Sequence, residues 1–137
     1  MFDAMQITST ALSAESVRLD LVANNLANAT TTKTSSGFPY QSESAVLASL
    51  PAPSQGADAG IGQGVVVSAI LSSQAPFPET YDPSSPLANA QGYVAEPNVS
   101  LSAQMVDMAE ASQAYQANAN AFTADKNMVL KALTLGA

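Results

Sequence analysis

Residues 98–135 read NVSLSAQMVDMAEASQAYQANANAFTADKNMVLKALTL, and this segment decides the fold of the 137-residue chain. Apolar side chains recur in it at intervals of seven residues, and two more lie on a neighbouring column. The first set is Leu101, Met108, Tyr115, Phe122 and Val129, and the second is Met105 and Leu133. An apolar residue at every seventh position keeps one edge of an α-helix turned toward a partner helix. We therefore predict a helix from just after Pro97 to about Leu135.

The ends of this segment carry the residues that helix ends favour. Asn98 or Ser100 is expected to cap the first turn, and Gly136 to terminate the helix. Lys126 and Lys131 lie toward the C-terminal end, where cations suit the helix dipole. A helix of this length extends about 50 Å, more than a small globule encloses. Its apolar edge is therefore expected to meet a second helix and other chains.

A second stripe with the same spacing lies near the N-terminus. It consists of Met5, Leu12, Leu19 and Leu26. It predicts a helix over residues 3–28, which the run Thr30 to Thr32 then stops. Ser9, Ser16 and Ala23 lie on a neighbouring column and are small enough to permit close helix approach. An ordinary helical hairpin within one chain is an equally good interpretation of this pattern.

The middle of the chain predicts a small β-rich module. Residues 65–71, VVVSAIL, form the strongest strand pattern, and weaker ones cover residues 40–50 and 77–81. Pro76 and Pro78 confine the last of these to a sheet edge.

The remainder of the middle is loop-like. Residues 33–64 have few signals of order, and residues 82–98 are extended and rich in turns. The predicted fold is mainly α with a small β-rich middle, the two terminal helices pairing as a coiled coil. Residues 1–30 plus 98–137 would form the helical core, and residues 31–97 the β-rich and loop module.

Charge and composition exclude several classes of function. Charged residues make up 11% of the chain, against about 25% in an average soluble domain. The net charge is −7, and the cations are Arg18, Lys33, Lys126 and Lys131. Nucleic-acid binding, which needs many phosphate contacts, is therefore not expected. A surface with so few charges can be dehydrated at low cost, which favours close packing against other molecules.

The chain contains no Cys and no His. Disulfides, Cys or His nucleophiles and zinc sites with Cys or His ligands are thereby excluded. Asp107 and Glu110 would share a helix face, as paired catalytic carboxylates sometimes do, but solvated helix charges explain them better. We expect no catalytic residues, no cofactor and no metal. The N-terminus also lacks the basic start and apolar core of a secretory signal, and residues 59–78 are too interrupted to span a membrane.

Several motifs in the same order resemble those of a known family. Residues 23–30, ANNLANAT, resemble the N-terminal signature of the bacterial flagellar axial proteins, which include rod and hook proteins. Further motifs look like those of a flagellar basal-body rod protein of the proximal rod. They are YDPSSPLANAQGYV at 81–94, PNV at 97–99, QMV at 104–106, AYQAN at 114–118, KNM at 126–128 and LTLG at 133–136.

This resemblance implies both a fold and a function. The terminal helices would pair as a coiled-coil core facing the axis of a helical tube, with the β-rich module outside. The chain would be a structural subunit of the proximal rod, in the drive-shaft that links the membrane ring to the distal rod. Its partners would be other proximal and distal rod proteins, the rod–ring adaptor and further copies of itself. The flagellar type III apparatus would export it, without a cleavable signal, to the basal body in the periplasmic space.

The same resemblance and the helix stripes indicate candidate interface residues. Asn24, Asn25 and Asn28 can hydrogen-bond neighbouring backbone where the first helix frays, or they can cap that helix. Tyr115 and Phe122 are candidates for anchors between subunits, although packing within one chain would explain them nearly as well. The alternative function is that of a coiled-coil secretion chaperone or a type III needle-like interaction protein. That class should lack the Pro-rich segment 82–98.

Overall fold

The computed structural model describes residues 2–51 and 62–135. Its elements follow the chain in the order α1 (Phe2–Ala27), β1 (Glu43–Ser49), β2 (Val65–Ser72), β3 (Glu79–Tyr81), β4 (Tyr93–Ala95) and α2 (Leu101–Leu135). The two terminal helices and the strand-containing middle confirm the predicted fold class at this level. Strand β4 lies within the segment predicted to be only extended and turn-rich. The predicted terminator Gly136 lies outside the described residues.

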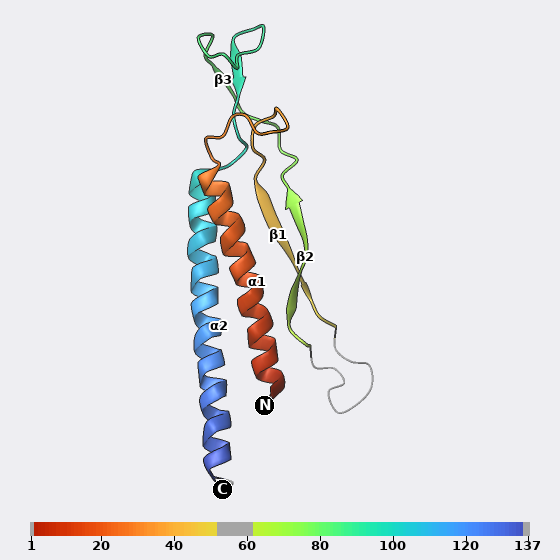
Figure 1. The fold of residues 1–137 in the computed structure, drawn as a ribbon, viewed down its shortest axis with the longest axis vertical. Helices are drawn as coiled ribbons and strands as arrows, with labels where there is room; N and C mark the ends of the chain where they lie inside the picture. The colour runs from red at the N-terminus through yellow and green to blue at the C-terminus, as the bar shows by residue number, and fades with distance from the viewer. Residues whose placement is uncertain (1, 52–61, 136–137) are drawn as a thin grey trace.

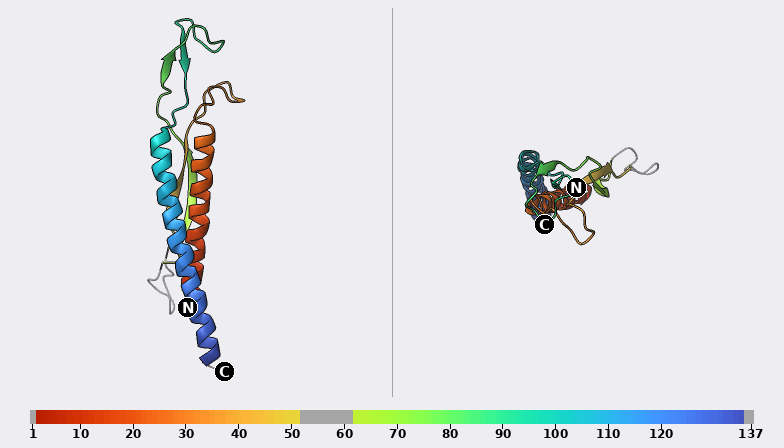
Figure 2. Two further views of the ribbon diagram at one scale, coloured as in Figure 1. Left: turned by 90° about the vertical axis from the view of Figure 1, so that its left-hand side faces the viewer. Right: turned by 90° about the horizontal axis from the view of Figure 1, so that it is seen from above.

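The helices α1 and α2 lie side by side and run in opposite directions (Figure 1). The start of α2 lies beside the end of α1, and the N-terminal end of α1 lies beside the C-terminal half of α2 (Figures 1 and 2). Because α2 has 35 residues and α1 has 26, α2 extends about 13 Å beyond α1 at that end. The hydroxyl of Ser100 accepts the N–H of Ala103 at 3.4 Å, which confirms Ser100 as the cap of α2.

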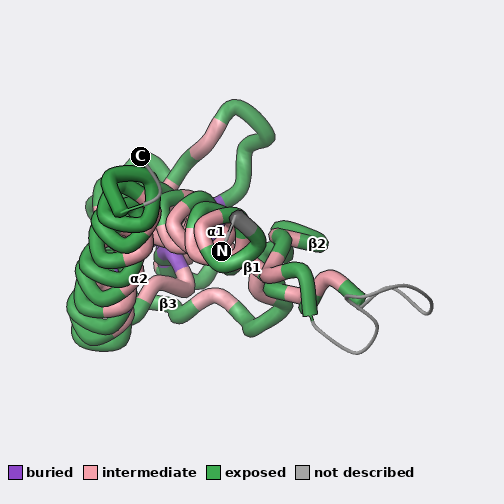
Figure 3. The backbone as a smooth tube through the Cα atoms, turned by 90° about the horizontal axis from the view of Figure 1, so that it is seen from below, coloured by how far each residue is buried: buried purple, intermediate pink, exposed green. Residues whose placement is uncertain are grey.

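The antiparallel hairpin β1–β2 lies along a second side of α1 (Figures 1 and 3). Its pairing runs from Glu43 opposite Ser72 to Ser49 opposite Val65, with one irregularity after Val46. The hydroxyl of Thr10 fastens the hairpin to α1 by accepting the N–H of Val65 at 3.1 Å. One long side of α1 is therefore covered by the hairpin and another by α2.

The second strand pair, β3–β4, projects beyond the helix ends (Figure 1). The rings of Tyr81 and Tyr93 pack edge to face, with their centres 5.2 Å apart. The turn that follows β3 is held by Asp82. Its carboxylate accepts hydrogen bonds from the Ser84 hydroxyl at 2.6 Å and from the Ser84 N–H at 3.1 Å. These hydrogen bonds lower the pKa of the Asp82 carboxyl. This short turn network and the buried side chain of Val94 keep the tip in shape.

The core of the chain is thin. The accessible surface is 8912 Å², whereas a compact monomer of 14.0 kDa would expose about 6,700 Å². The buried apolar residues in the described part of the chain are Ala14, Val22, Val94 and Ala111, and Figure 3 shows how much of the backbone carries exposed residues. Such a molecule obtains little stability from its own packing and presents a large surface to neighbours.

The small residues that are buried in the two helices are not those of the predicted column. Ser9, Ser16 and Ala23 are all exposed, so the prediction for this column was wrong. Ala14 and Ala111 are the small residues that are buried, at 3% and 0% exposure. The reason is that the hairpin occupies one side of α1, which turns the buried face of the helix away from the small-residue column.

The contact between Thr10 and Gly64 provides a test of hairpin docking. Gly64 has φ of +111°, and a Cβ at this position would collide with the Thr10 hydroxyl. We expect Gly64→Ala to lower the free energy of unfolding by about 1–3 kcal/mol, because both the backbone strain and the collision must be relieved. Urea denaturation measures the change. Gly62→Ala is the matched control because a Cβ at that position would meet no atom within 4 Å, and equal stability of the two variants would contradict the docking.

Candidate functional site

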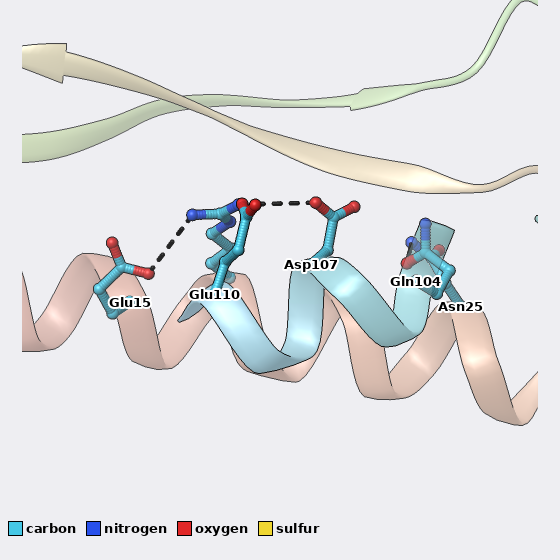
Figure 4. Close-up of polar contacts among 6 residues, drawn as sticks. Glu15, Asn25, Gln104, Asp107 and Glu110 are labelled. Carbon is cyan, nitrogen blue, oxygen red and sulfur yellow. Dashed lines mark hydrogen bonds and ion pairs between the residues drawn. The ribbon is translucent and has the colours of Figure 1, made fainter. Parts of the chain in front are cut away.

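The best-defined polar site is centred on Asn25, in the last turns of α1. Its side-chain amide donates to the Glu43 carbonyl oxygen at 2.7 Å and to Gln104 Oε1 at 2.9 Å. Its Oδ1 accepts the Tyr40 hydroxyl at 2.9 Å and the Glu43 N–H at 2.8 Å. The side chain is 1% exposed, and Figure 4 shows it beside Gln104, close to the strands. All four hydrogen-bonding positions of the amide group are used.

This site joins four parts of the chain through one side chain. Asn25 comes from α1, Tyr40 from the following loop, Glu43 from the start of β1 and Gln104 from the first turns of α2. Burial raises the pKa of the Tyr40 hydroxyl, and the nearby Glu43 carboxylate adds to that effect, so the hydroxyl stays protonated as a donor. Asn25 does not cap the end of α1; it bonds to backbone, as the other interpretation of the motif expects, and the backbone is that of Glu43 in β1. Asn25 is an internal connector.

The other asparagines of the motif have local roles. The Asn28 amide donates to the Asn24 carbonyl oxygen at 3.0 Å and to Asn24 Oδ1 at 2.9 Å, and Asn28 Oδ1 accepts the Thr31 hydroxyl at 3.2 Å. These bonds finish α1, as the capping interpretation expects. Farther along the chain, Asn98 accepts the Ser42 N–H and donates to the Ala75 carbonyl oxygen, both at 2.9 Å. Asn98 therefore ties the hairpin to the start of α2.

A charged cluster lies between α1 and α2, on the side that faces the hairpin (Figure 4). The Arg18 guanidinium lies 3.8 Å from Glu15, 3.6 Å from Asp107 and 3.5 Å from Glu110. The Asp107 and Glu110 side chains are 44% and 64% exposed, so each ion pair contributes little to stability. Glu15 Oε2 is buried and accepts no hydrogen bond from the described residues. Three carboxylates against one guanidinium leave this region negative.

The two predicted apolar stripes are divided between the interior and the surface. The half-buried members are Met5, Leu12, Leu19, Leu26, Met108, Phe122 and Val129. The exposed members are Leu101, Met105, Tyr115 and Leu133. Asn24 is exposed and Asn28 is half-buried. The α1 stripe thus lies partly inside the chain, and much of the α2 stripe faces outward.

Sequence reasoning missed the residues that α2 turns inward. They are Gln104, Ala111 and Asn118, which also recur every seven residues and are half-buried or buried. The sequence contains a signal that could have found them, namely this repeat of small and polar residues. A search that counts only apolar residues overlooks it. A polar Gln at the head of the series fits the partner it meets, Asn25.

Within the described residues there is no candidate metal site and no candidate membrane-spanning helix. In the ranges 2–51 and 62–135, no three acidic, His or Cys side chains are close enough to hold a metal ion. Of the helices in the described ranges, none has a stretch that is both apolar enough and long enough to cross a membrane.

Comparison with known proteins gives a consistent result. Residues 5–33 match the family model described as flagella basal body rod protein, and residues 90–135 match that of the C-terminal part of flagellar basal body rod FlgEFG proteins. The chain is 40% identical over 136 residues to the flagellar basal-body rod protein FlgC of Salmonella typhimurium, covering 99% of this chain and 98% of that protein. It is 42% identical to FlgC of Escherichia coli O6:H1 with the same coverage, and 36% identical to FlgC of Bacillus subtilis, covering 98% and 97%.

Proposed function

Because this chain belongs to the FlgC family of flagellar basal-body rod proteins, we propose that its terminal helices are the elements through which it assembles. The chain is a structural subunit of the rod and not an enzyme. One observation supports the role of the helices above all others. Of the apolar residues that repeat along α2, Leu101, Met105 and Leu133 are exposed in the single chain.

The proposed assembled form is a coiled-coil core with the β-rich module outside it. The antiparallel contact of α1 with α2 supports this arrangement, since it puts two long apolar stripes into one rod-shaped unit. Residues 1–30 and 98–137 would form the core along the axis of the tube, and residues 31–97 the module outside. Dehydrating such a weakly charged surface costs little, which favours dense packing.

The family resemblance suggests a more exact position in the flagellum. We place the chain in the proximal rod, in the drive-shaft that links the membrane ring to the distal rod. Its neighbours would be other rod proteins, the rod–ring adaptor and copies of itself. The flagellar type III apparatus would export it into the periplasmic space. The names of its relatives, which are basal-body rod proteins, support the rod location.

A secretion chaperone or needle-like subunit was the other candidate, and the solution state of the isolated chain distinguishes it from a rod subunit. We expect a monomer in size-exclusion chromatography with light scattering, because a rod subunit should become fully ordered only with its partners in the rod. Hydrogen exchange should be rapid at both helix termini and slow there only after assembly. A stable dimer with protected termini would favour the chaperone.

A further inference from the structure

The last part of strand β2 has an outer edge that no described strand covers. Residues 69–72 pair without interruption with residues 43–46 of β1, and the sheet that β1 and β2 form has two strands. One edge of β2 is therefore occupied by β1, and the other is not paired. We call the backbone of residues 69–72 on that side the open edge.

The register shows which backbone groups the open edge presents. The N–H of Ser73 donates to the Ser42 carbonyl oxygen at 2.7 Å, just beyond the last pair of the strands. Because bonding alternates along an antiparallel pair, Ile70 and Ser72 turn their backbone groups away from β1. The Gln74 side chain donates to the Ser72 carbonyl oxygen at 3.3 Å. The N–H groups of Ile70 and Ser72 form no hydrogen bond with the described residues and are available to a partner.

The open edge faces away from α1. Asn25 of α1 bonds to both the N–H and the carbonyl oxygen of Glu43, the residue opposite Ser72. The two outer edges of a strand pair point in opposite directions, so the edge of β2 at this end points outward (Figure 1). At the other end of the hairpin, Thr10 bonds to the N–H of Val65 in β2. Side chains of α1 thus occupy the edges that face them and leave the open edge free.

The side chains of the open edge favour a strand as its partner. Ile70 and Leu71 are 52% and 55% exposed, and as neighbours in a strand they lie on opposite faces of the sheet. A helix packed on the hairpin would cover one of these faces, whereas an added strand lies beside both. Residues 65–72 also contain no charged residue and no Pro, which are the features that protect many natural edge strands from pairing.

The open edge ends at a hollow of about 460 Å³. Ser72 lines it together with Phe38 and Tyr40 from the loop after α1 and Phe77 from the segment after β2, and we call it the aromatic hollow. Phe38 is 67% exposed. Ile70 and Ser72 lie on the same face of the sheet, because side chains alternate along a strand. A strand added beside them would therefore carry its next side chain on that face toward the aromatic hollow.

We propose that the open edge and the aromatic hollow together bind an extended segment of a different protein. The segment adds to β2 as a third strand and places a large apolar side chain in the hollow. Backbone hydrogen bonds supply affinity in this mode of recognition, and the pocket for a side chain supplies specificity.

The choice of a different protein rests on the function proposed above, in which the terminal helices form a common core. Two copies joined through their open edges would lie with both hairpins between them, because that edge faces away from α1. Their helices would then be on opposite sides of the contact and could not share a core. A segment from a protein outside the core meets no such obstacle.

The full-length chain and a synthetic peptide test the binding directly. The peptide acetyl-Gln-Val-Thr-Phe-Thr-Gln-amide has Val and Phe on one face, spaced to lie beside Ile70 and in the aromatic hollow. We expect its binding to slow hydrogen exchange of the Ile70 and Ser72 amides in nuclear magnetic resonance spectra. Replacing the Phe of the peptide with Ala should weaken binding about tenfold. Binding without slower exchange at these amides would contradict strand addition, and equal affinity of the two peptides would contradict the role of the hollow.

Variants of the chain separate the backbone contribution from the side-chain contribution. Ile70→Pro removes an outward N–H and keeps the bonds to β1, so it should weaken peptide binding about tenfold. Ile70→Thr retains the N–H and is the matched control, with a smaller loss. Phe38→Ala should remove the difference between the Phe and Ala peptides. Equal affinity of the two Ile70 variants would overturn the proposed pairing.

A measurement in basal bodies tests the source of the segment. Leu71 would be replaced by photoreactive benzoylphenylalanine in the source bacterium, and purified basal bodies would be irradiated. We expect a product that joins one copy of this chain to a different polypeptide and that disappears when Ile70→Pro is added. A product made of two copies would overturn the choice of a different protein. Basal bodies that contain the chain but give no product would overturn the proposal and leave the rod function intact. Absence of the unmodified chain from basal bodies would instead contradict the rod function.

Discussion

Asn25→Ala is expected to lower the free energy of unfolding by about 3–4 kcal/mol, the largest effect of any single polar substitution in this chain. It removes the amide group that joins α1 to β1, to Tyr40 and to Gln104. The donors and acceptors left behind are partly buried, and each unpaired one costs about 1–3 kcal/mol unless water reaches it. A domain has only about 5–15 kcal/mol of stability in total. The hairpin and the start of α2 should separate from α1.

Asn24→Ala is the matched control for that substitution. It lies next to Asn25 on the same helix but is exposed, and its side chain accepts one bond, from Asn28. Its cost should stay within about 0.5 kcal/mol. Thermal denaturation gives both values, and swimming at raised temperature should fail only for Asn25→Ala. Equal melting temperatures for the two variants would show that the buried network is not what holds the elements together.

Phe122→Asp is expected to abolish rod assembly and swimming while leaving the amount of expressed protein unchanged. Phe122 is half-buried on α2, and the substitution removes an aromatic side chain and puts a carboxylate in an apolar contact, at about 3–5 kcal/mol. Leu26→Asp, at the C-terminal end of the apolar stripe of α1, should have the same effect on assembly and swimming. Swimming-zone diameter and electron microscopy of purified basal bodies are the measurements.

Phe122→Leu is the control, because it keeps an apolar side chain at the same position of α2. It should retain assembly, with at most a modest loss of stability. The role given to the terminal helices is refuted if the two aspartate variants swim as well as the unmodified chain. An aspartate variant that is exported but absent from basal bodies would locate the defect in assembly.

Much of the architecture could be predicted because local patterns determine it. The spacing of Leu12 and Leu19, the strand pattern at 65–71 and the cap at Ser100 depend only on residues near one another in sequence. Strand β4 was not predicted, because three residues in a turn-rich segment become a strand only through pairing with β3. The absence of Cys and His likewise excluded whole classes of chemistry without a structure.

The candidate site could be predicted less well. Asn25 was named within the right motif, as a residue that bonds to neighbouring backbone or caps the helix, but its partners were not identified, since nothing local indicates that Glu43 and Gln104 lie beside it. Likewise, the apolar repeat marked Met105 as an edge residue without showing whether its own chain would cover it. Exposure of Met105 depends on where a second helix lies, which a linear pattern does not contain.

The sequence alone determined two long terminal helices, a β-rich middle, a weakly charged surface and the family to which the chain belongs. Only the tertiary structure decided which face of each helix is turned inward, that Ala14 and Ala111 are the small residues that are buried, and that Asn25 joins four segments. Helix formation is governed by neighbours a few residues away. The rotation of a helix about its axis is governed by whatever packs against it, here a hairpin and a helix from distant parts of the chain.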